Sequence, residues 1–171
     1  EGEASLLAPH RRDICAAFLD LRGFTAFTDR AEPEEVMSVL TEFHAAVGPL
    51  IDAHRGTVPH FAGDGVLVFF NDPLPSDDPC GDAARMALAM QANFVPLAAR
   101  WRKLGHDLGL GIGAARGYAT LGAVGYEGRV DYSAIGSVVN LAARLCGEAA
   151  GGQILVDRRA GENLETDLAA F

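Results

Sequence analysis

Two amphipathic helical patterns, separated by a pair of short apolar runs, constrain the fold of this chain more than any other feature. In each pattern, large apolar side chains recur at steps of three and four residues, which is typical of a helix with one buried face. The first pattern starts after Pro33 and should end at Gly56, and Pro96 should kink the second. The two stripes are Val36, Leu40, Phe43, Val47 and Leu50, then Met86, Met90, Phe94, Leu97, Trp101 and Leu104. Both helices therefore need an apolar surface to pack on.

Short apolar runs supply that surface as strands. Ile14–Leu19 is apolar throughout, and two further runs flank Asp64-Gly65, a strong signal for a hairpin. A run at 108–113 places glycine at every second position, which predicts a bare face where another element packs at backbone distance. The hairpin strands are 57–61 and 66–70, and the later elements are strands 118–124 and 130–135, a helix 137–149 and a strand 153–156. This order predicts an α+β fold, a ferredoxin-like sandwich with helices packed on a mainly antiparallel sheet.

Length and charge limit the classes of function. The 171 residues suffice for one domain with a core, which we expect over 12–171, after a linker remnant at 1–11. Because the chain starts at Glu1, we expect a fragment of a longer protein whose regulatory domains lie outside this sequence. We also expect that the C-terminal end of the catalytic domain can be truncated at residue 171. A net charge of −9 argues against nucleic acid or anionic membranes as partners. The apolar runs are shorter than the ~20 residues of a membrane span. Three scattered cysteines are too few for a disulfide framework or a zinc site, which favours a cytoplasmic domain.

Two aspartates carry the first functional signal. Asp20 ends the first apolar run, and Asp64 lies at the turn of the predicted hairpin. A central hairpin beside the first strand would bring the two carboxylates together, where they would repel each other unless a cation lies between them. Mg²⁺ or Mn²⁺ is the natural occupant because both prefer oxygen ligands. The turn at Gly23, which follows Asp20, suits a polyphosphate, so the pattern indicates phosphoryl chemistry.

Asn140 and Arg144 carry the second signal. They are four residues apart in the predicted helix 137–149, so they share a face and can reach one ligand. The alternative is a surface pair between Arg144 and Glu148, worth a few tenths of a kcal/mol. Asn140 lies between Val139 and Leu141, an apolar setting that favours a buried or interfacial role.

Three long segments resemble the catalytic domain of class III nucleotidyl cyclases, which comprise adenylyl and guanylyl cyclases. They are Phe18-Leu19-Asp20-Leu21-Arg22-Gly23-Phe24-Thr25, then Phe61-Ala62-Gly63-Asp64-Gly65-Val66, and finally Asp131-Tyr132-Ser133-Ala134-Ile135-Gly136 running into Val139-Asn140-Leu141-Ala142-Ala143-Arg144-Leu145. They occur in the family order and span most of the chain.

The resemblance implies a role for each of these positions. Asp20, Asp64 and the Leu21 carbonyl would bind two divalent metal ions, and the backbone at Gly23, Phe24 and Thr25 would bind phosphates. Asn140 would orient the ribose, and Arg144 would stabilise charge on the transferred phosphorus. The resemblance also implies a head-to-tail homodimer in which Asn140 and Arg144 come from the partner chain.

Base recognition departs from the family pattern. Adenylyl cyclases carry Lys four residues before the second metal Asp and Asp or Thr seven residues before the Asn, whereas guanylyl cyclases carry Glu and a small residue such as Cys. This chain has His60 and Ser133 at these two positions. Both side chains can donate or accept a hydrogen bond, so their chemistry does not determine whether the base is adenine or guanine. We favour ATP because neither position has a carboxylate to accept from guanine.

Three functions are therefore compared. The first is an adenylyl cyclase that converts ATP to 3′,5′-cyclic AMP and pyrophosphate. The second is a guanylyl cyclase that makes cyclic GMP. The third is a regulatory nucleotide-binding or dimerisation module with little catalysis, which only the unusual His60 favours.

Overall fold

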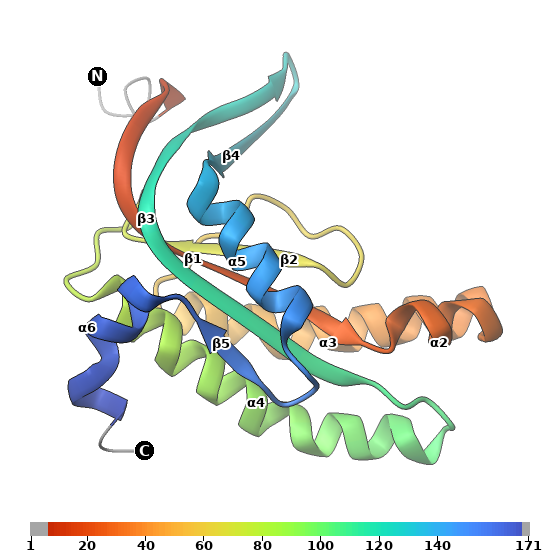
Figure 1. Cartoon of the computed structure of the whole chain (residues 1–171). Helices are drawn as coiled ribbons and strands as arrows, with labels where there is room; N and C mark the ends of the chain where they lie inside the picture. Colours follow the sequence, from red (N-terminus) through yellow and green to blue (C-terminus); the bar gives the residue numbers. More distant parts are fainter. Residues whose placement is uncertain (1–6, 169–171) are drawn as a thin grey trace.

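A five-stranded sheet forms the centre of the fold, with α3 and α4 against one face and α5 against the other (Figure 1). The structure, a computed structural model, describes residues 7–168. The strands are β1 (His10–Arg22), β2 (Val66–Phe70), β3 (Gly109–Tyr126), β4 (Arg129–Ile135) and β5 (Ile154–Val156). The helices are α2 (Phe24–Arg30), α3 (Pro33–Ala53), α4 (Pro79–Lys103), α5 (Ser137–Glu148) and α6 (Arg158–Leu168). The predicted α+β class and mainly antiparallel sheet are confirmed.

The long strand β1 organises the sheet. The strand order is β2-β1-β3-β4, all antiparallel, and β5 pairs in parallel with β3. β1 pairs with β3 over its whole length, from His10 opposite Leu121 to Arg22 opposite Gly109. Its C-terminal end carries Asp20, so the pairing places this carboxylate next to the glycine-rich start of β3.

The structure corrects three predicted strands. Runs 108–113 and 118–124 form the single strand β3, because β1 continues beside them without a break and pairs with the residues between them. Segment 57–61 is not a strand: only Thr57 bridges to Phe69, and Pro59 lacks the N–H that a strand would donate. The short helix α2 was not predicted as an element of its own.

The boundaries of the long elements agree more closely with the prediction. α4 continues past Pro96 and buries its expected stripe except Leu104, which follows the helix and is 67% exposed. α3 buries Phe43 and Val47 as expected, but its other buried residues are Val39 and Ile51, whereas the remaining predicted positions are half-buried. β1 begins at His10, so it includes two residues of segment 1–11, which was expected to be a linker. Within the described residues, no helix is both long and apolar enough to cross a membrane. All three cysteines are buried and free.

The bare face of β3 is the contact surface of α5. A Cβ atom on Gly113 would lie 2.2 Å from the amide nitrogen of Cys146 and 2.5 Å from the carbonyl oxygen of Ala142. A Cβ on Gly109 would lie 2.9 Å from the Cα of Gly151. The prediction that an element packs here at backbone distance is confirmed, and it fixes the position of the helix that carries Asn140 and Arg144.

The β3–β4 hairpin extends beyond the helices as an arm (Figure 1). Large apolar side chains are exposed along it, and Tyr126 reaches 70% exposure. These exposed side chains are Tyr118, Val124, Tyr126, Val130 and Ile135. An arm of this composition is typical of a surface that packs on another protein chain.

A buried acid ties this arm to the sheet. Asp72 is 4% exposed, and its carboxylate accepts from the hydroxyl of Tyr132 on β4 and pairs with the ring Nε2 of His10 at 2.8 Å. The bond from His10 to the Ala8 carbonyl and the contact with Asp72 raise the pKa of His10 above its ordinary value.

We expect this contact to make stability depend on pH. A His with a raised pKa in the folded state contributes stability that is complete below its unfolded pKa, near 6.5. This contribution should decrease as the pH rises through the higher, folded pKa of His10. Urea unfolding across this range would measure it, with His10→Gln as the control that should remove this part of the pH dependence. An identical pH dependence in the variant would contradict the prediction.

Candidate active site

Asp20 and Arg22 form an ion pair at the end of β1. They are two residues apart on a strand, so their side chains share a face. The guanidinium of Arg22 donates through Nε to Oδ1 of Asp20 at 2.9 Å and through Nη2 to both carboxylate oxygens. Its Nη1 also donates to the carbonyl of Gly147 in α5, at 2.9 Å. Arg22 therefore links the predicted metal-binding carboxylate to the end of α5.

Asp64 lies in a two-residue turn. Ala62 and Gly65 form a bridge on either side of it, and Gly63 has a φ of 66°, which favours glycine. His44 of α3 anchors the turn, because its Nε2 lies 2.7 Å from the Gly63 carbonyl oxygen. The predicted turn is confirmed, although the segment before it is not a strand.

The fold brings Asp20 and Asp64 together. Burial raises the pKa of Asp64 above its ordinary value, and the negative charge of Asp20 raises it further. The thiol of Cys146 on α5 also faces this region: burial first, then the charge of Asp20, raises its pKa to about 12. Two carboxylates that repel each other in a partly buried place form a site that a cation would stabilise.

The donor atoms fit a hard divalent ion. Asp20 and Asp64 offer carboxylate oxygens, and Leu21 can offer only its backbone carbonyl because its side chain, which is buried, has no donor atom. Oxygen donors of this kind suit Mg²⁺ or Mn²⁺. Among the described residues, no group of three His, Cys, Asp or Glu side chains could hold a metal ion. The remaining ligands would therefore have to come from substrate oxygens or water.

The predicted phosphate-binding segment forms a tight turn between β1 and α2. Gly23 has a φ of 87°, and a Cβ there would lie 2.8 Å from the carbonyl oxygen of Asp107, so only glycine fits. Phe24 packs partly on the core, and Thr25 is exposed in the first turn of α2. The turn therefore ends β1 at Arg22, two residues after Asp20.

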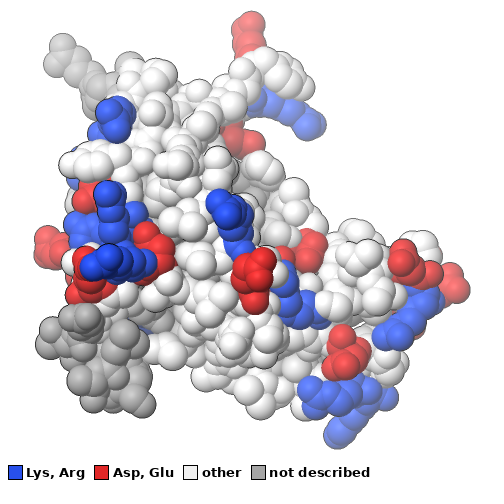
Figure 2. All heavy atoms as spheres, viewed as in Figure 1, with Lys and Arg blue, Asp and Glu red and all other residues white. Residues whose placement is uncertain are grey.

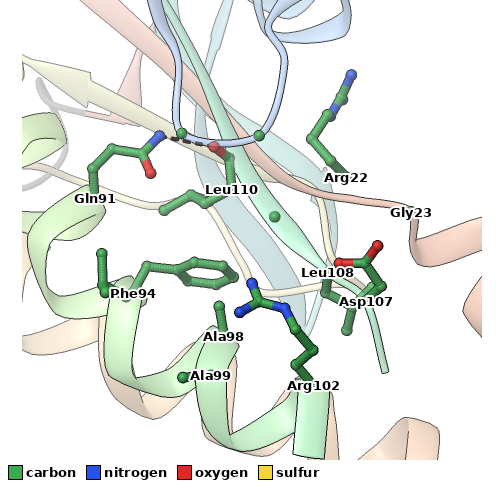
Figure 3. A pocket seen from close by; sticks show the side chains of 14 residues that line it. Arg22, Gly23, Gln91, Phe94, Ala98, Ala99, Arg102, Asp107, Leu108 and Leu110 are labelled. Atoms are coloured by element: carbon green, nitrogen blue, oxygen red, sulfur yellow. Dashed lines mark hydrogen bonds between the residues drawn. The ribbon is translucent and has the colours of Figure 1, made fainter. Parts of the chain in front are cut away.

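A pocket of about 560 Å³ lies beside the same turn (Figure 3). Phe94, Ala98 and Arg102 project into it from α4, and Gln91 donates to the Leu110 carbonyl at 2.8 Å. Of the predicted site residues, only Gly23 lines it. A ligand there would contact the turn without reaching Asp64, Asn140 or Arg144.

Asn140 and Arg144 line a different pocket, of about 730 Å³. Both side chains are exposed, and neither makes a hydrogen bond or ion pair with another described side chain, so the alternative pair with Glu148 does not form. Arg11, Arg116 and Arg159 also line the pocket, with Asp157 as its acidic residue. Arg side chains, drawn in blue, are visible over α5 and around the start of α6 in Figure 2. The pocket is therefore cationic, although the chain as a whole is acidic.

The two predicted base-recognition residues lie close to one common neighbour, Asp131. Nδ1 of His60 is 3.2 Å from Oδ2 of Asp131 on β4. Ser133 follows two residues later on the same strand and is opposite Gly122 in β3. Side chains two residues apart share a face of the strand, so β4 places Ser133 on the side where Asp131 meets His60.

Two residues of this site, Arg22 and Asp131, were missed by the sequence reasoning. Both lie in the motifs quoted above. Each is two residues from a predicted site residue on the same strand, so Arg22 shares a face with Asp20, and Asp131 shares a face with Ser133. That periodicity could have indicated Arg22 as a partner of Asp20. The contact between Asp131 and His60 could not be predicted, because it joins segments about seventy residues apart in the sequence.

Comparison with known proteins identifies the family. The model of the adenylate and guanylate cyclase catalytic domain matches residues 7–171, nearly the whole chain. The chain belongs to this family. Adenylate cyclase 1 of Rhizobium meliloti is 33% identical over 82% of this chain and 21% of its own length, and an adenylate cyclase of Anabaena cylindrica is 30% identical over 82% and 28%. The chain thus spans a quarter or so of these cyclases, which contain much additional sequence.

Solved cyclase structures share the fold. The adenylyl cyclase CyaB of P. aeruginosa superposes with a TM-score of 0.88 at 31% identity, covering 94% of this chain and 84% of that one. The guanylyl cyclase Cya2 superposes with a TM-score of 0.85 at 34% identity, covering 90% and 79%. The adenylyl cyclase and the guanylyl cyclase are thus about equally similar to this chain. Overall similarity therefore does not decide which nucleotide the chain uses as substrate.

Proposed function

We propose that this cyclase domain converts ATP to 3′,5′-cyclic AMP and pyrophosphate. The observation that carries the proposal is the convergence of Asp20 and Asp64 beside the Gly23 turn, with Asn140 and Arg144 exposed and unengaged on α5. In the reaction, the ribose 3′-hydroxyl attacks the α-phosphorus and pyrophosphate leaves.

The aspartates provide the metal-binding half of the site. Asp20, Asp64 and the Leu21 carbonyl would hold two Mg²⁺ or Mn²⁺ ions, which when bound would activate the hydroxyl and neutralise the triphosphate. Arg22 forms an ion pair with the carboxylate of Asp20 in the structure, so its guanidinium would compete with a metal ion for those oxygens. The turn at Gly23, Phe24 and Thr25 would hold phosphate oxygens through backbone N–H groups.

The other half would come from a second chain. Asn140 would orient the ribose, and the guanidinium of Arg144 would stabilise the charge that develops on the transferred phosphoryl group. Their exposure, the cationic pocket around them and the apolar arm of β3–β4 support a homodimer with two shared sites. The length of the relatives supports fused regulatory domains outside this chain.

The preference for ATP rests on the base site. His60 and Ser133 offer no carboxylate to accept from N1–H and N2–H of guanine, whereas both can donate to or accept from adenine. A guanylyl cyclase is the second candidate, favoured by the small Ser133 and by the similarity to Cya2.

Product analysis tests the proposal. The domain, at micromolar concentration with Mn²⁺, is given ATP and GTP separately and then as an equimolar mixture, and the products are separated by chromatography. We expect cyclic AMP to dominate, and Asp64→Asn to abolish its formation. Dominant cyclic GMP would establish the second candidate instead, and no product from either nucleotide would reject both.

A further inference from the structure

Arg22 lies in a slot between the bare face of β3 and the end of α5. Its Nη1 donates to the carbonyl of Gly147 at 2.9 Å, while Nε and Nη2 donate to the carboxylate of Asp20. A Cβ atom on Gly111 would lie 3.1 Å from Nε of Arg22, so this glycine leaves room for the guanidinium. The side chains of Arg22 and Asp20 are only 28% and 27% exposed. The fold therefore holds a positive charge directly on the carboxylate that the proposed chemistry needs for a metal ion.

The charges at this end of β1 do not balance without a metal ion. Asp20 and Asp64 are both acidic, whereas Arg22 supplies one positive charge that no ordinary pH removes. Burial raises the pKa of Asp64, the charge of Asp20 raises it further, and the charge of Arg22 lowers it. Arg22 thus reduces the repulsion between the two carboxylates in the metal-free domain.

The bond to Gly147 gives the guanidinium a second anchor. Gly147 is the last residue but one of α5, so its carbonyl has no N–H partner further along the helix. A positive charge is also favoured at the C-terminal end of a helix dipole. A guanidinium has five N–H groups, and Nη1 alone makes the bond to Gly147. Arg22 can therefore release the oxygens of Asp20 and remain at the end of α5.

We propose that Arg22 is a positioning residue of the metal site, which holds the carboxylate of Asp20 as a built-in counter-ion and yields its oxygens to a divalent ion. The inference rests on the proposed function, because it requires Asp20 to be a metal ligand. It adds two properties to that function. Arg22 stabilises the domain without metal, and it lowers the affinity of the free domain for a divalent ion.

Binding of Mn²⁺ to the domain without nucleotide provides the first test, with the electron paramagnetic resonance signal of free Mn²⁺ as the readout. We expect the apparent dissociation constant for Mn²⁺ to fall about tenfold in Arg22→Gln, since the ion no longer displaces charge-assisted hydrogen bonds. Asp20→Asn should lose most of the binding, because it removes a metal ligand. An affinity of Arg22→Gln equal to or weaker than that of the wild type would overturn the proposal, and so would the absence of Mn²⁺ binding in both proteins.

Two control variants separate the role of Arg22 from a general effect of charge. Arg85 of α4 pairs with Asp82 at 2.9 Å, so Arg85→Gln also removes one paired arginine and changes the net charge equally. This variant should keep the wild-type affinity for Mn²⁺. Arg22→Lys keeps the charge but loses the planar fork of the guanidinium, and its affinity should lie between those of the wild type and Arg22→Gln. An equal gain in Arg85→Gln would assign the effect to net charge and contradict the proposal.

Urea unfolding supplies a second readout that does not depend on turnover. In EDTA, Arg22→Gln should be less stable than the wild type, because Asp20 then faces Asp64 without a counter-ion. Saturating Mn²⁺ should reduce this difference, since an ion that binds the folded variant more tightly stabilises it more. A difference in stability that is the same in EDTA and in Mn²⁺ would show that Arg22 has only a structural role.

Failure of this inference is distinguishable from failure of the proposed function. Tighter binding of Mn²⁺ by Arg22→Gln, with no cyclic product from the wild-type domain, would reject the proposed function and leave the role of Arg22 intact. Formation of cyclic AMP by the wild type, with an affinity for Mn²⁺ that Arg22→Gln does not change, would reject the role of Arg22 alone.

Discussion

Two inactive variants, Asp20→Ala and Arg144→Ala, should regain about a quarter of the wild-type activity when they are mixed and allowed to exchange subunits. Asp20→Ala removes a metal ligand, and Arg144→Ala removes a cation at the transition state, typically worth ~10²-fold or more in rate. Each homodimer therefore has two defective sites.

The recovery follows from the sharing of sites between chains. In a mixed dimer, one site combines both substitutions, and the other combines an intact Asp20 from one chain with an intact Arg144 from its partner. Random exchange makes about half of the dimers mixed, and one of their two sites is intact, which gives about a quarter of full activity. The large rise over either variant alone makes the result easy to measure as cyclic nucleotide formed per minute.

The control is a mixture of Asp20→Ala with Asp64→Asn. Both substitutions affect the same half of the site, so every mixed dimer lacks a metal ligand in each site and no activity should return. Asp20→Ala and Arg144→Ala could also fail to complement each other although native mass spectrometry shows mixed dimers. In that case Asp20 and Arg144 of one site belong to the same chain. That result would reject the shared site.

Gly113→Val should prevent the domain from folding stably. The added Cβ would lie 2.2 Å from the backbone nitrogen of Cys146 and 2.5 Å from the carbonyl oxygen of Ala142. Backbone atoms of a helix cannot move aside as a flexible side chain can, so α5 as a whole would have to lift from β3. Overpacking of this kind costs about 3 kcal/mol or more, a large part of the stability of a domain.

Urea unfolding measures the effect, and Gly48→Ala is the matched control. Gly48 lies within α3, where an added Cβ would meet no atom within 4 Å. Alanine should stabilise a helix at such a position by about 0.5–1 kcal/mol. Gly113→Ala should be destabilising but less severe than Val, and it should also lower activity because α5 carries Arg144. A Gly113→Val domain as stable as the wild type would show that α5 does not pack on β3 as described.

The sequence alone determined the parts of this protein that depend on local periodicity. Apolar stripes at helical spacing located α3 and α4, and alternating glycines identified the bare face of β3. Asp20 and Asp64 could be placed at a strand end and a turn, because apolar runs and the Asp-Gly pair define both features within a few residues. Three motifs in family order then predicted the cyclase family.

The tertiary structure decided what depends on contacts between distant segments. β3 is one strand because β1 pairs with it without a break from Gly109 to Leu121, a fact that no local pattern in 108–124 contains. Likewise, His60 and Asp131 are about seventy residues apart in the sequence, and only the fold brings Nδ1 of His60 within 3.2 Å of Oδ2 of Asp131. The sequence therefore determined which side chains are present, whereas long-range strand pairing decided which of them meet.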